Sequence, residues 1–214
     1  MRKVLVSVLC LTVGLLVADL GFAASKKTAE RKAEAKSEVA SPAIAKSKLL
    51  MVADFDSGEL INNLGGAFGA WNKDPNDKTQ GCKADFIKPG YGEKGQSLMI
   101  TYDVDSSNPS YNGLWMKLED QNLTGFSKLS FWVKGDKDAG FTNKFKVELK
   151  SSMESSFVYV EYVGENWNLV EIPFAKFNKI TNWNMINEFV IVFEDSQVTK
   201  KSGAIYVDEI AFVK

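Results

Sequence analysis

The sequence predicts an all-β fold for residues 49–214, an antiparallel β-sandwich of jelly-roll type, and three observations indicate it. Short runs rich in β-branched and aromatic residues recur along this region, and clusters of Gly, Asn, Asp, Ser and Pro separate them. No long run has helical spacing. Several runs alternate, so that Leu129, Phe131 and Val133 point one way while the residues between them point the other. Strands with one buried face each pack as two antiparallel sheets.

The pattern predicts about nine strands, which are listed here in chain order: 49–55, 96–103, 113–118, 128–134, 144–150, 157–163, 168–173, 188–193 and 204–213. The run Phe189–Phe193 is apolar on both faces, so we expect it to be central and covered on its second side. The one candidate helix, around Phe174–Asn178, is a single turn.

The N-terminus has the pattern of a secretory signal. Arg2 and Lys3 precede an apolar run, Val4–Ala24, in which Asp19 is the only charge and small residues close the run. An uncleaved anchor is the alternative, and a lipid anchor is disfavoured because Cys10 lies in the middle of the run. We therefore expect a signal peptide over 1–24, a periplasmic or extracellular protein, and no stable membrane span after cleavage.

Residues 25–48 consist mainly of Lys, Glu, Ala and Ser and contain no aromatic residue. Such a segment cannot bury enough apolar surface to offset the entropy of ordering it. We expect a disordered charged linker here, followed by one β-sandwich domain over 49–214 that is monomeric.

Composition excludes several classes of function. The formal net charge is -1 with charges of both signs interspersed, so there is no basic field for nucleic acid. The chain has no histidine, which removes the commonest general base and most transition-metal sites. After signal removal only Cys82 remains, so no intramolecular disulfide can form. Any catalysis would have to use carboxylates or lysine.

Three carboxylates lie at the two ends of the domain. Asp54 and Asp56 share a face of the first strand, and Asp208 shares a face with Ile210 and Phe212, where a core residue belongs. If the first and last strands meet, the three converge, and oxygen ligands alone favour a hard ion such as Ca²⁺. Alternatively, Asp54 or Asp56 caps a turn before Gly58, and Asp208 pairs with a lysine or with backbone amides.

Large aromatic residues occupy positions that should face solvent. Trp115 shares a side with Lys117, Trp132 shares a side with Lys134, and Tyr159 shares a side with a glutamate. Indole rings stack on the flat C–H faces of sugars, and flanking polar groups bind the hydroxyls. The candidate ligand-binding residues are therefore Trp115, Trp132, Tyr159, Glu148, Asn112 and Trp71. The alternative is that these rings pack under loops.

Trp71 lies in a predicted long loop, 62–82, that is dense in Gly, Asn and Asp. It could border a ligand groove or close one end of the sandwich. Glu148 with Glu161 or Glu171 could form the paired carboxylates of a glycosidase, although such pairs are common by chance in strand-rich proteins.

Five segments in order carry a resemblance to a known group of domains: 52–58 (VADFDSG), 95–102 (GQSLMITY), 129–135 (LSFWVKG), 167–174 (WNLVEIPF) and 203–212 (GAIYVDEIAF). Together they resemble the galactose-binding-like jelly rolls, above all the family eleven carbohydrate-binding modules and the domain of complex I intermediate-associated protein 30.

The resemblance implies a structural calcium ion where the first strand meets the last, with Asp56 and Asp208 as acids and Asp54 donating a carbonyl. It also implies a glycan site on the concave sheet or on the loops at one edge. We therefore expect non-catalytic binding of a polysaccharide or oligosaccharide. The alternatives are a protein-interaction or assembly module of the envelope and, less favoured, a carboxylate glycosidase.

Overall fold

A computed structural model of the protein describes Lys48–Lys214, and in this part of the chain it contains eleven strands and two 3-10 turns. In order these are β1 (Leu49–Ala53), β2 (Phe68–Asn72), β3 (Gly81–Ile87), η1 (Tyr91–Glu93), β4 (Ser97–Asp103), β5 (Tyr111–Gln121), β6 (Lys128–Gly135), β7 (Phe145–Ser151), β8 (Ser155–Val160), β9 (Asn168–Pro173), η2 (Phe174–Lys176), β10 (Ile186–Glu194) and β11 (Ser202–Val213). The expected signal peptide, and the expected linker up to residue 47, lie outside the described residues.

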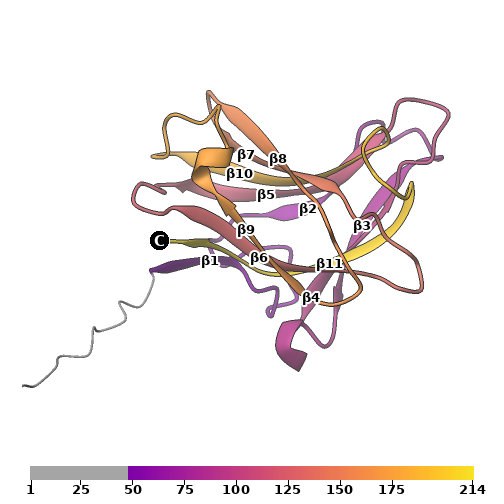
Figure 1. Ribbon diagram of the computed structural model, residues 1–214, viewed down its shortest axis with the longest axis horizontal. Helices are drawn as coiled ribbons and strands as arrows, with labels where there is room; N and C mark the ends of the chain where they lie inside the picture. The colour runs from indigo at the N-terminus through magenta and orange to yellow at the C-terminus, as the bar shows by residue number, and fades with distance from the viewer. Residues whose placement is uncertain (1–47) are drawn as a thin grey trace, which may run out of the picture. The chain divides into compact units, whose positions relative to one another are not determined.

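The strands form two antiparallel sheets that face each other (Figure 1). One has six strands in the order β3-β4-β11-β6-β9, with β1 also paired to β11, and the other has five in the order β2-β5-β10-β7-β8. The predicted all-β sandwich is therefore confirmed. The first and last strands do meet, since Leu49 pairs with Val213 and Leu50 with Phe212.

The core lies between the sheets and consists of the inward residues of each alternating strand. Phe131 of β6 and Phe189 of β10 meet across the interface with ring centroids 6.3 Å apart, and Tyr102 stacks on Phe193 at 4.1 Å. All four are at most 1% exposed. The alternation seen in the sequence thus decides which face of each strand is buried.

The segment 62–82 is not one long loop, because it contains β2 and the start of β3. Phe68 begins β2 and is buried, with its ring 5.6 Å from Phe55 and 6.2 Å from Phe86. One inward aromatic anchors this strand, and the many Gly and Asn residues of the segment 62–82 made it look like a loop in the sequence. The expected turn at Phe174 is confirmed as η2. Within Lys48–Lys214, no helix has the length and apolar character needed to cross a membrane.

A β-bulge changes the facing of residues along β11. The pairing with β6 shifts between Asp208 and Ala211, and Glu209 adopts a left-handed conformation with φ 47°. The extra residue reverses the alternation, so Asp208 lies on the outer side of the sheet, opposite Trp132, while Ile210 faces the core. The prediction that Asp208 shares a face with Ile210 is therefore wrong.

Candidate functional site

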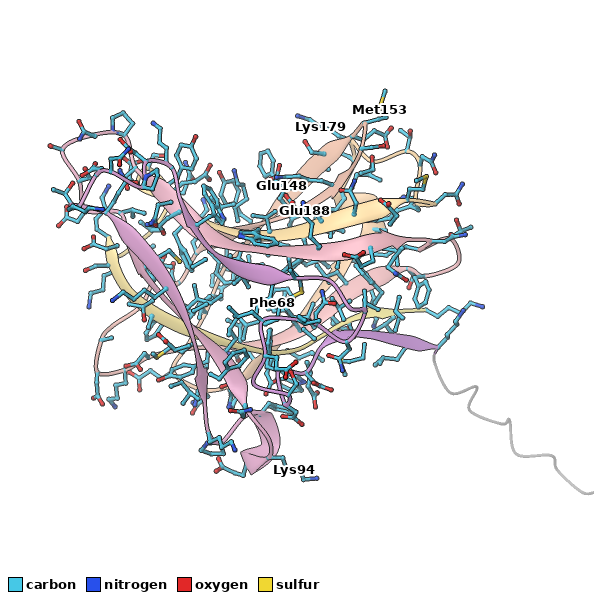
Figure 2. All side chains as sticks on the ribbon, turned by 180° about the vertical axis from the view of Figure 1, so that it is seen from behind. Phe68, Lys94, Glu148, Met153, Lys179 and Glu188 are labelled. Carbon is cyan, nitrogen blue, oxygen red and sulfur yellow. The ribbon has the colours of Figure 1, made fainter. Side chains whose placement is uncertain are left out.

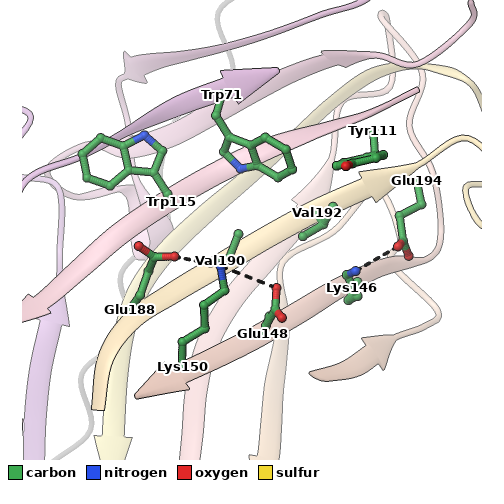
Figure 3. Close-up of a pocket in the computed structure, with 10 residues that line it drawn as sticks. All are labelled: Trp71, Tyr111, Trp115, Lys146, Glu148, Lys150, Glu188, Val190, Val192 and Glu194. Carbon is green, nitrogen blue, oxygen red and sulfur yellow. Dashed lines mark hydrogen bonds and ion pairs between the residues drawn. The ribbon is translucent and has the colours of Figure 1, made fainter. Parts of the chain in front are cut away.

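A groove of about 570 Å³ lies on the outer face of the five-stranded sheet (Figure 3). Strands β2, β5, β10 and β7 all contribute to it, so neighbouring register positions decide which side chains meet. We call this the outer groove; its lining residues are Trp71, Tyr111, Trp115, Lys146, Glu148, Lys150, Glu188, Val190, Val192 and Glu194.

One wall of the outer groove is aromatic. Trp71 of β2 is paired with Gly113 of β5, and Trp115 of β5 is paired with Gly69 of β2, so each indole has a glycine beside it. A Cβ atom on Gly69 would lie 3.7 Å from the Trp115 ring, which is ordinary contact. Tyr111 extends the wall, with its ring edge-on to Trp71 at 5.7 Å. The wall therefore consists of three rings from two adjacent strands.

The floor of the outer groove is apolar and belongs to β10. Val190 and Val192 are each 3% exposed, while Ile191 and Phe193 on the other side of the strand are in the core. The central position predicted for the run Phe189–Phe193 is confirmed. Its second face, however, is covered by no further layer; it forms the floor on which the walls of the groove stand.

The opposite wall is polar and its charges are paired. Glu188 accepts hydrogen bonds from Lys117 at 2.5 Å and from Lys150 at 2.9 Å, and Lys150 lies 4.0 Å from Glu148. Burial raises the pKa of Glu188, but the hydrogen bonds from Lys117 and Lys150 outweigh burial, so this pKa lies below its usual range. Glu188 is therefore held as a carboxylate.

A second polar set continues this wall. Glu194 accepts hydrogen bonds from Lys146 and from the hydroxyl of Tyr159, each at 2.8 Å. Burial, together with Glu194, raises the pKa of Tyr159 to about 12. With Lys117, three lysines thus face three glutamates, and this wall is charged but close to neutral overall.

The structure brings together part of the predicted site. Trp71, Trp115 and Glu148 line the outer groove, and Tyr159 contacts it through Glu194. Sequence reasoning missed several lining residues: Tyr111, Lys150, Glu188, Val190, Val192 and Glu194. The available signal was the apolar outer face of β10. A central strand that is apolar on both faces needs other side chains to cover each face.

Asn112 does not reach the groove. It is fully buried, and its amide nitrogen donates to the carbonyl oxygens of Gly81 at 3.0 Å and Asp103 at 2.7 Å. The next residue along β5, Gly113, is paired with the outward-pointing Trp71, so alternation puts Asn112 on the core side. Its role is to join β5 to the six-stranded sheet, and the predicted ligand contact is wrong.

Trp132 lies on the other sheet from Trp115. It stacks on Tyr91 of η1 at 3.8 Å, and Trp167 meets Tyr91 edge-on at 6.0 Å. These rings hold η1 against the outer face of the six-stranded sheet, above Asp208. The alternative of a ring packed under a loop therefore describes Trp132, and the two tryptophans cannot line one groove.

Two of the predicted acidic residues, Asp208 and Asp56, lie near η1, but the three carboxylates do not form a cluster. Asp208 is 3% exposed, and its oxygens accept the backbone N–H groups of Tyr91 at 2.7 Å and Glu209 at 2.8 Å. Asp56 accepts the backbone N–H of Gln96 at 2.8 Å. Burial raises the pKa of Asp208 to about 6, with Asp56 among the smaller contributors.

The Asp54 side chain turns elsewhere: it accepts the amide N–H of Asn63 at 2.8 Å and the backbone N–H of Asp56 at 3.2 Å. This is the turn cap that the sequence offered as an alternative. Among residues 48–214, no group of three acidic, histidine or cysteine side chains is placed to hold a metal ion. Asp208 is buried and has Asp56 near it, and carboxylate oxygens are the ligand type that a hard cation prefers.

One carboxylate ties together the loops that lead into the aromatic wall. Asp77, in the β2–β3 loop, accepts hydrogen bonds from the side chains of Thr79, Gln80, Ser106 and Asn108. Ser106 and Asn108 belong to the β4–β5 loop, which leads to Tyr111. Hydrogen bonds, first of all from Thr79, hold the pKa of Asp77 well below its usual range.

The stabilising effect of Asp77 is expected to depend on pH. Its folded pKa is depressed, so its contribution is complete above the unfolded pKa of about 4 and is lost as pH falls below it. We expect Asp77→Asn to lower the melting temperature at pH 7, with a smaller effect near pH 3. Melting curves of both proteins at several pH values test this, and a difference that does not change with pH would argue against it.

Comparison with known proteins agrees with this architecture. The family described as carbohydrate binding domain (family 11) matches residues 38–187. No curated protein matches the chain. The family 11 module of the cellulosomal cellulase Lic26A-Cel5E of Clostridium thermocellum is a similar solved structure, with a TM-score of 0.59, 18% identity, and coverage of 78% of this chain and 94% of that one.

A second structure, a family 11 module from Clostridium thermocellum in complex with a β-1,3-1,4-mixed-linked tetrasaccharide, has a TM-score of 0.59 and 19% identity. The alignment covers 77% of this chain and 95% of that one. At these identities the likeness shows the fold. The family match spans more than half of the sequence, and the chain therefore belongs to the family 11 carbohydrate-binding modules.

Proposed function

We propose that the outer groove binds a segment of a neutral polysaccharide and that the protein performs no chemistry on it. The observation that supports this most is the combination of a ring wall, with Trp71 and Trp115, and a polar wall across an apolar floor. Indole rings stack on sugar C–H faces, and the lysines and glutamates bind hydroxyls. The complex of the Clostridium thermocellum module makes a β-1,3-1,4-linked glucan the first ligand to try.

The protonation state of the glutamates in the outer groove supports binding without catalysis. A glycosidase needs one carboxylic acid with a raised pKa to protonate the leaving group. The pKa of Glu188 is instead lowered, and Glu194 is paired with Lys146. We expect no release of sugar from any polysaccharide that the protein binds.

Calorimetric titration of the protein tests the proposal, with neutral β-glucan oligosaccharides and, for comparison, an oligosaccharide of uronic acids. The near-neutral polar wall gives no reason to prefer an anionic chain, so we expect binding to a neutral member of the panel. Binding to none of them, or tighter binding to the uronic acids, would contradict the proposal. Saturable capture of an envelope protein without glycan binding would favour the protein-interaction alternative.

Binding in the outer groove is expected to be nearly independent of salt. Ionic screening weakens interactions between unpaired charges, whereas neutral hydroxyls and stacked rings are little affected. We expect the dissociation constant for a neutral oligosaccharide to change less than about threefold when the Debye length falls from about 10 Å to 3 Å. Titrations at low and high NaCl measure this, and a steep loss of affinity would indicate an anionic ligand.

We also propose that Ca²⁺ stabilises the fold at η1, with Asp56 and Asp208 as acidic ligands. Asp54 would donate its backbone carbonyl, which leaves its carboxylate free to cap the turn. The support is the burial of Asp208: its two backbone hydrogen bonds do not outweigh burial, since its pKa stays raised, and a cation would compensate the remaining cost. We further propose that the protein is exported, since residues 1–24 have the pattern of a secretory signal.

A further inference from the structure

A second pocket, of about 440 Å³, lies at the end of the sandwich where the C-terminus is found (Figure 1). It is formed by the β5–β6 loop, by the loop before β10 and by the first residue of η2. Its lining residues, which we call the end pocket, are Leu123, Thr124, Gly125, Phe126, Phe174, Thr181, Asn182, Trp183 and Asn184. No charged side chain is among them, in contrast to the outer groove.

The end pocket contains a tryptophan ring that packs against two phenylalanine rings. Trp183 stacks on Phe174 with ring centroids 3.9 Å apart and an interplanar angle of 3°, and Phe177 meets it edge-on at 6.4 Å. The backbone N–H of Leu123 donates to the carbonyl of Trp183 at 2.8 Å, which joins the two loops. A ring already ordered in this way loses little entropy when a ligand covers it.

The rim of the end pocket is built from hydroxyl and amide groups. Thr124 donates from its hydroxyl to the Asn184 side-chain oxygen at 2.6 Å, and the Asn184 backbone N–H donates to the Asn182 side-chain oxygen at 3.0 Å. Both amide oxygens are thus directed inward to the loop. Within the described residues, neither amide nitrogen donates a hydrogen bond to the protein, so both are available to a ligand.

Glu154, in the β7–β8 turn, keeps this loop in place. Its carboxylate accepts the hydroxyl and backbone N–H of Thr181, at 2.5 and 2.9 Å, and the backbone N–H of Asn182 at 3.1 Å. These bonds, first of all the one from the Thr181 hydroxyl, lower the pKa of Glu154. Neutral donors to Glu154 therefore order the rim without an ion pair. None of the residues that line the pocket is charged.

We propose that the end pocket is a second saccharide site, which takes one or two neutral sugar units. An indole held by packing, neutral amide donors and a hydroxyl are the groups that recognise sugar hydroxyls and C–H faces. The pocket lies on loops at one end of the sandwich, whereas the outer groove runs over a sheet. The protein is thus bivalent, and this second site does not depend on binding in the groove.

The five tryptophans of the chain offer a direct test. Each indole N–H gives its own signal in a ¹⁵N–¹H correlation spectrum: Trp71 and Trp115 report on the outer groove, Trp183 on the end pocket, and Trp132 and Trp167 on the other sheet. The full chain is titrated with methyl β-glucoside, methyl β-galactoside, methyl α-mannoside and a β-1,3-1,4-mixed-linked tetrasaccharide. Each probe is added to about ten times a dissociation constant in the millimolar range, so that a weak site is also filled.

We expect at least one probe to shift the Trp183 signal while Trp132 and Trp167 stay unchanged. The shift should persist in a Trp71→Ala, Trp115→Ala double variant, in which groove binding is removed. A Trp183 signal that moves with none of the four probes, or only when the groove is intact, would overturn the second site. If the Trp183 signal shifts but the Trp71 and Trp115 signals shift with none of the probes, only the proposed function of the outer groove is contradicted.

A matched pair of exposed asparagines provides the second arm. Asn184→Ala removes an amide donor of the rim, whereas Asn178→Ala changes an exposed asparagine outside the end pocket. One hydrogen bond corresponds to an affinity loss of about threefold to tenfold. We expect that loss at Trp183 for Asn184→Ala only, and equal affinities of the two variants would overturn the assignment of the rim.

Discussion

Replacing Trp115 with alanine is expected to raise the dissociation constant for a neutral oligosaccharide about thirtyfold, since truncating a central aromatic anchor costs about 2 kcal/mol. Trp115 is on the outer side of β5, and its neighbours Leu114 and Met116 fill the core, so the fold should survive. Calorimetry on the wild-type and variant proteins measures the change.

Trp132→Ala is the matched control for this experiment. It removes an indole of similar partial exposure, but from the six-stranded sheet, where it stacks on Tyr91. We expect its affinity for the oligosaccharide to equal that of the wild type. If Trp132→Ala weakens binding as much as Trp115→Ala does, the site is not confined to the outer groove.

Removing calcium is expected to have the largest effect on stability. A ligand at a hundredfold excess over its dissociation constant adds about 2.7 kcal/mol to the free energy of unfolding. For a domain of this size, that corresponds to a loss of roughly 5–10 °C in melting temperature when a chelator is added. Differential scanning calorimetry with Ca²⁺ and with chelator measures the difference.

Variants of two aspartates that differ in exposure distinguish the loss of bound calcium from a general loss of stability. Asp208→Asn replaces the buried carboxylate next to η1, and its melting curves with calcium and with chelator should coincide. Asp85→Ala changes an exposed aspartate on β3 and should keep the full difference. Identical wild-type curves in calcium and chelator would rule out the proposed ion.

Much of the fold could be predicted because facing follows from alternation. Leu129, Phe131 and Val133 are all buried, and the sequence pattern places them together on one side of β6. Alternation cannot say to which sheet a strand belongs. Trp115 and Trp132 therefore seemed equivalent in the sequence, although strand order puts them on opposite outer faces of the sandwich.

Other parts of the site depend on local departures from regular structure. The face of the sheet on which Asp208 lies could not be predicted. The bulge requires a left-handed backbone at Glu209, and the sequence has no glycine there to indicate it. Glu188 and Glu194 lie near the two ends of β10, where a short apolar run gives no information on what flanks it in space. Only the pairing of β10 with β5 and β7 brings these residues into the groove.

The side-chain view in Figure 2 shows Glu148 and Glu188 on the side of the five-stranded sheet away from the sandwich interior, and the sugar should lie there. The most direct test is a crystal structure of the protein with a bound neutral β-glucan oligosaccharide. We predict sugar rings against Trp71 and Trp115, with hydroxyls on the polar wall formed by Glu148, Glu188 and Glu194 and their lysine partners. Sugar bound only over Trp132, or no sugar in the outer groove at saturating concentration, would contradict the proposed function.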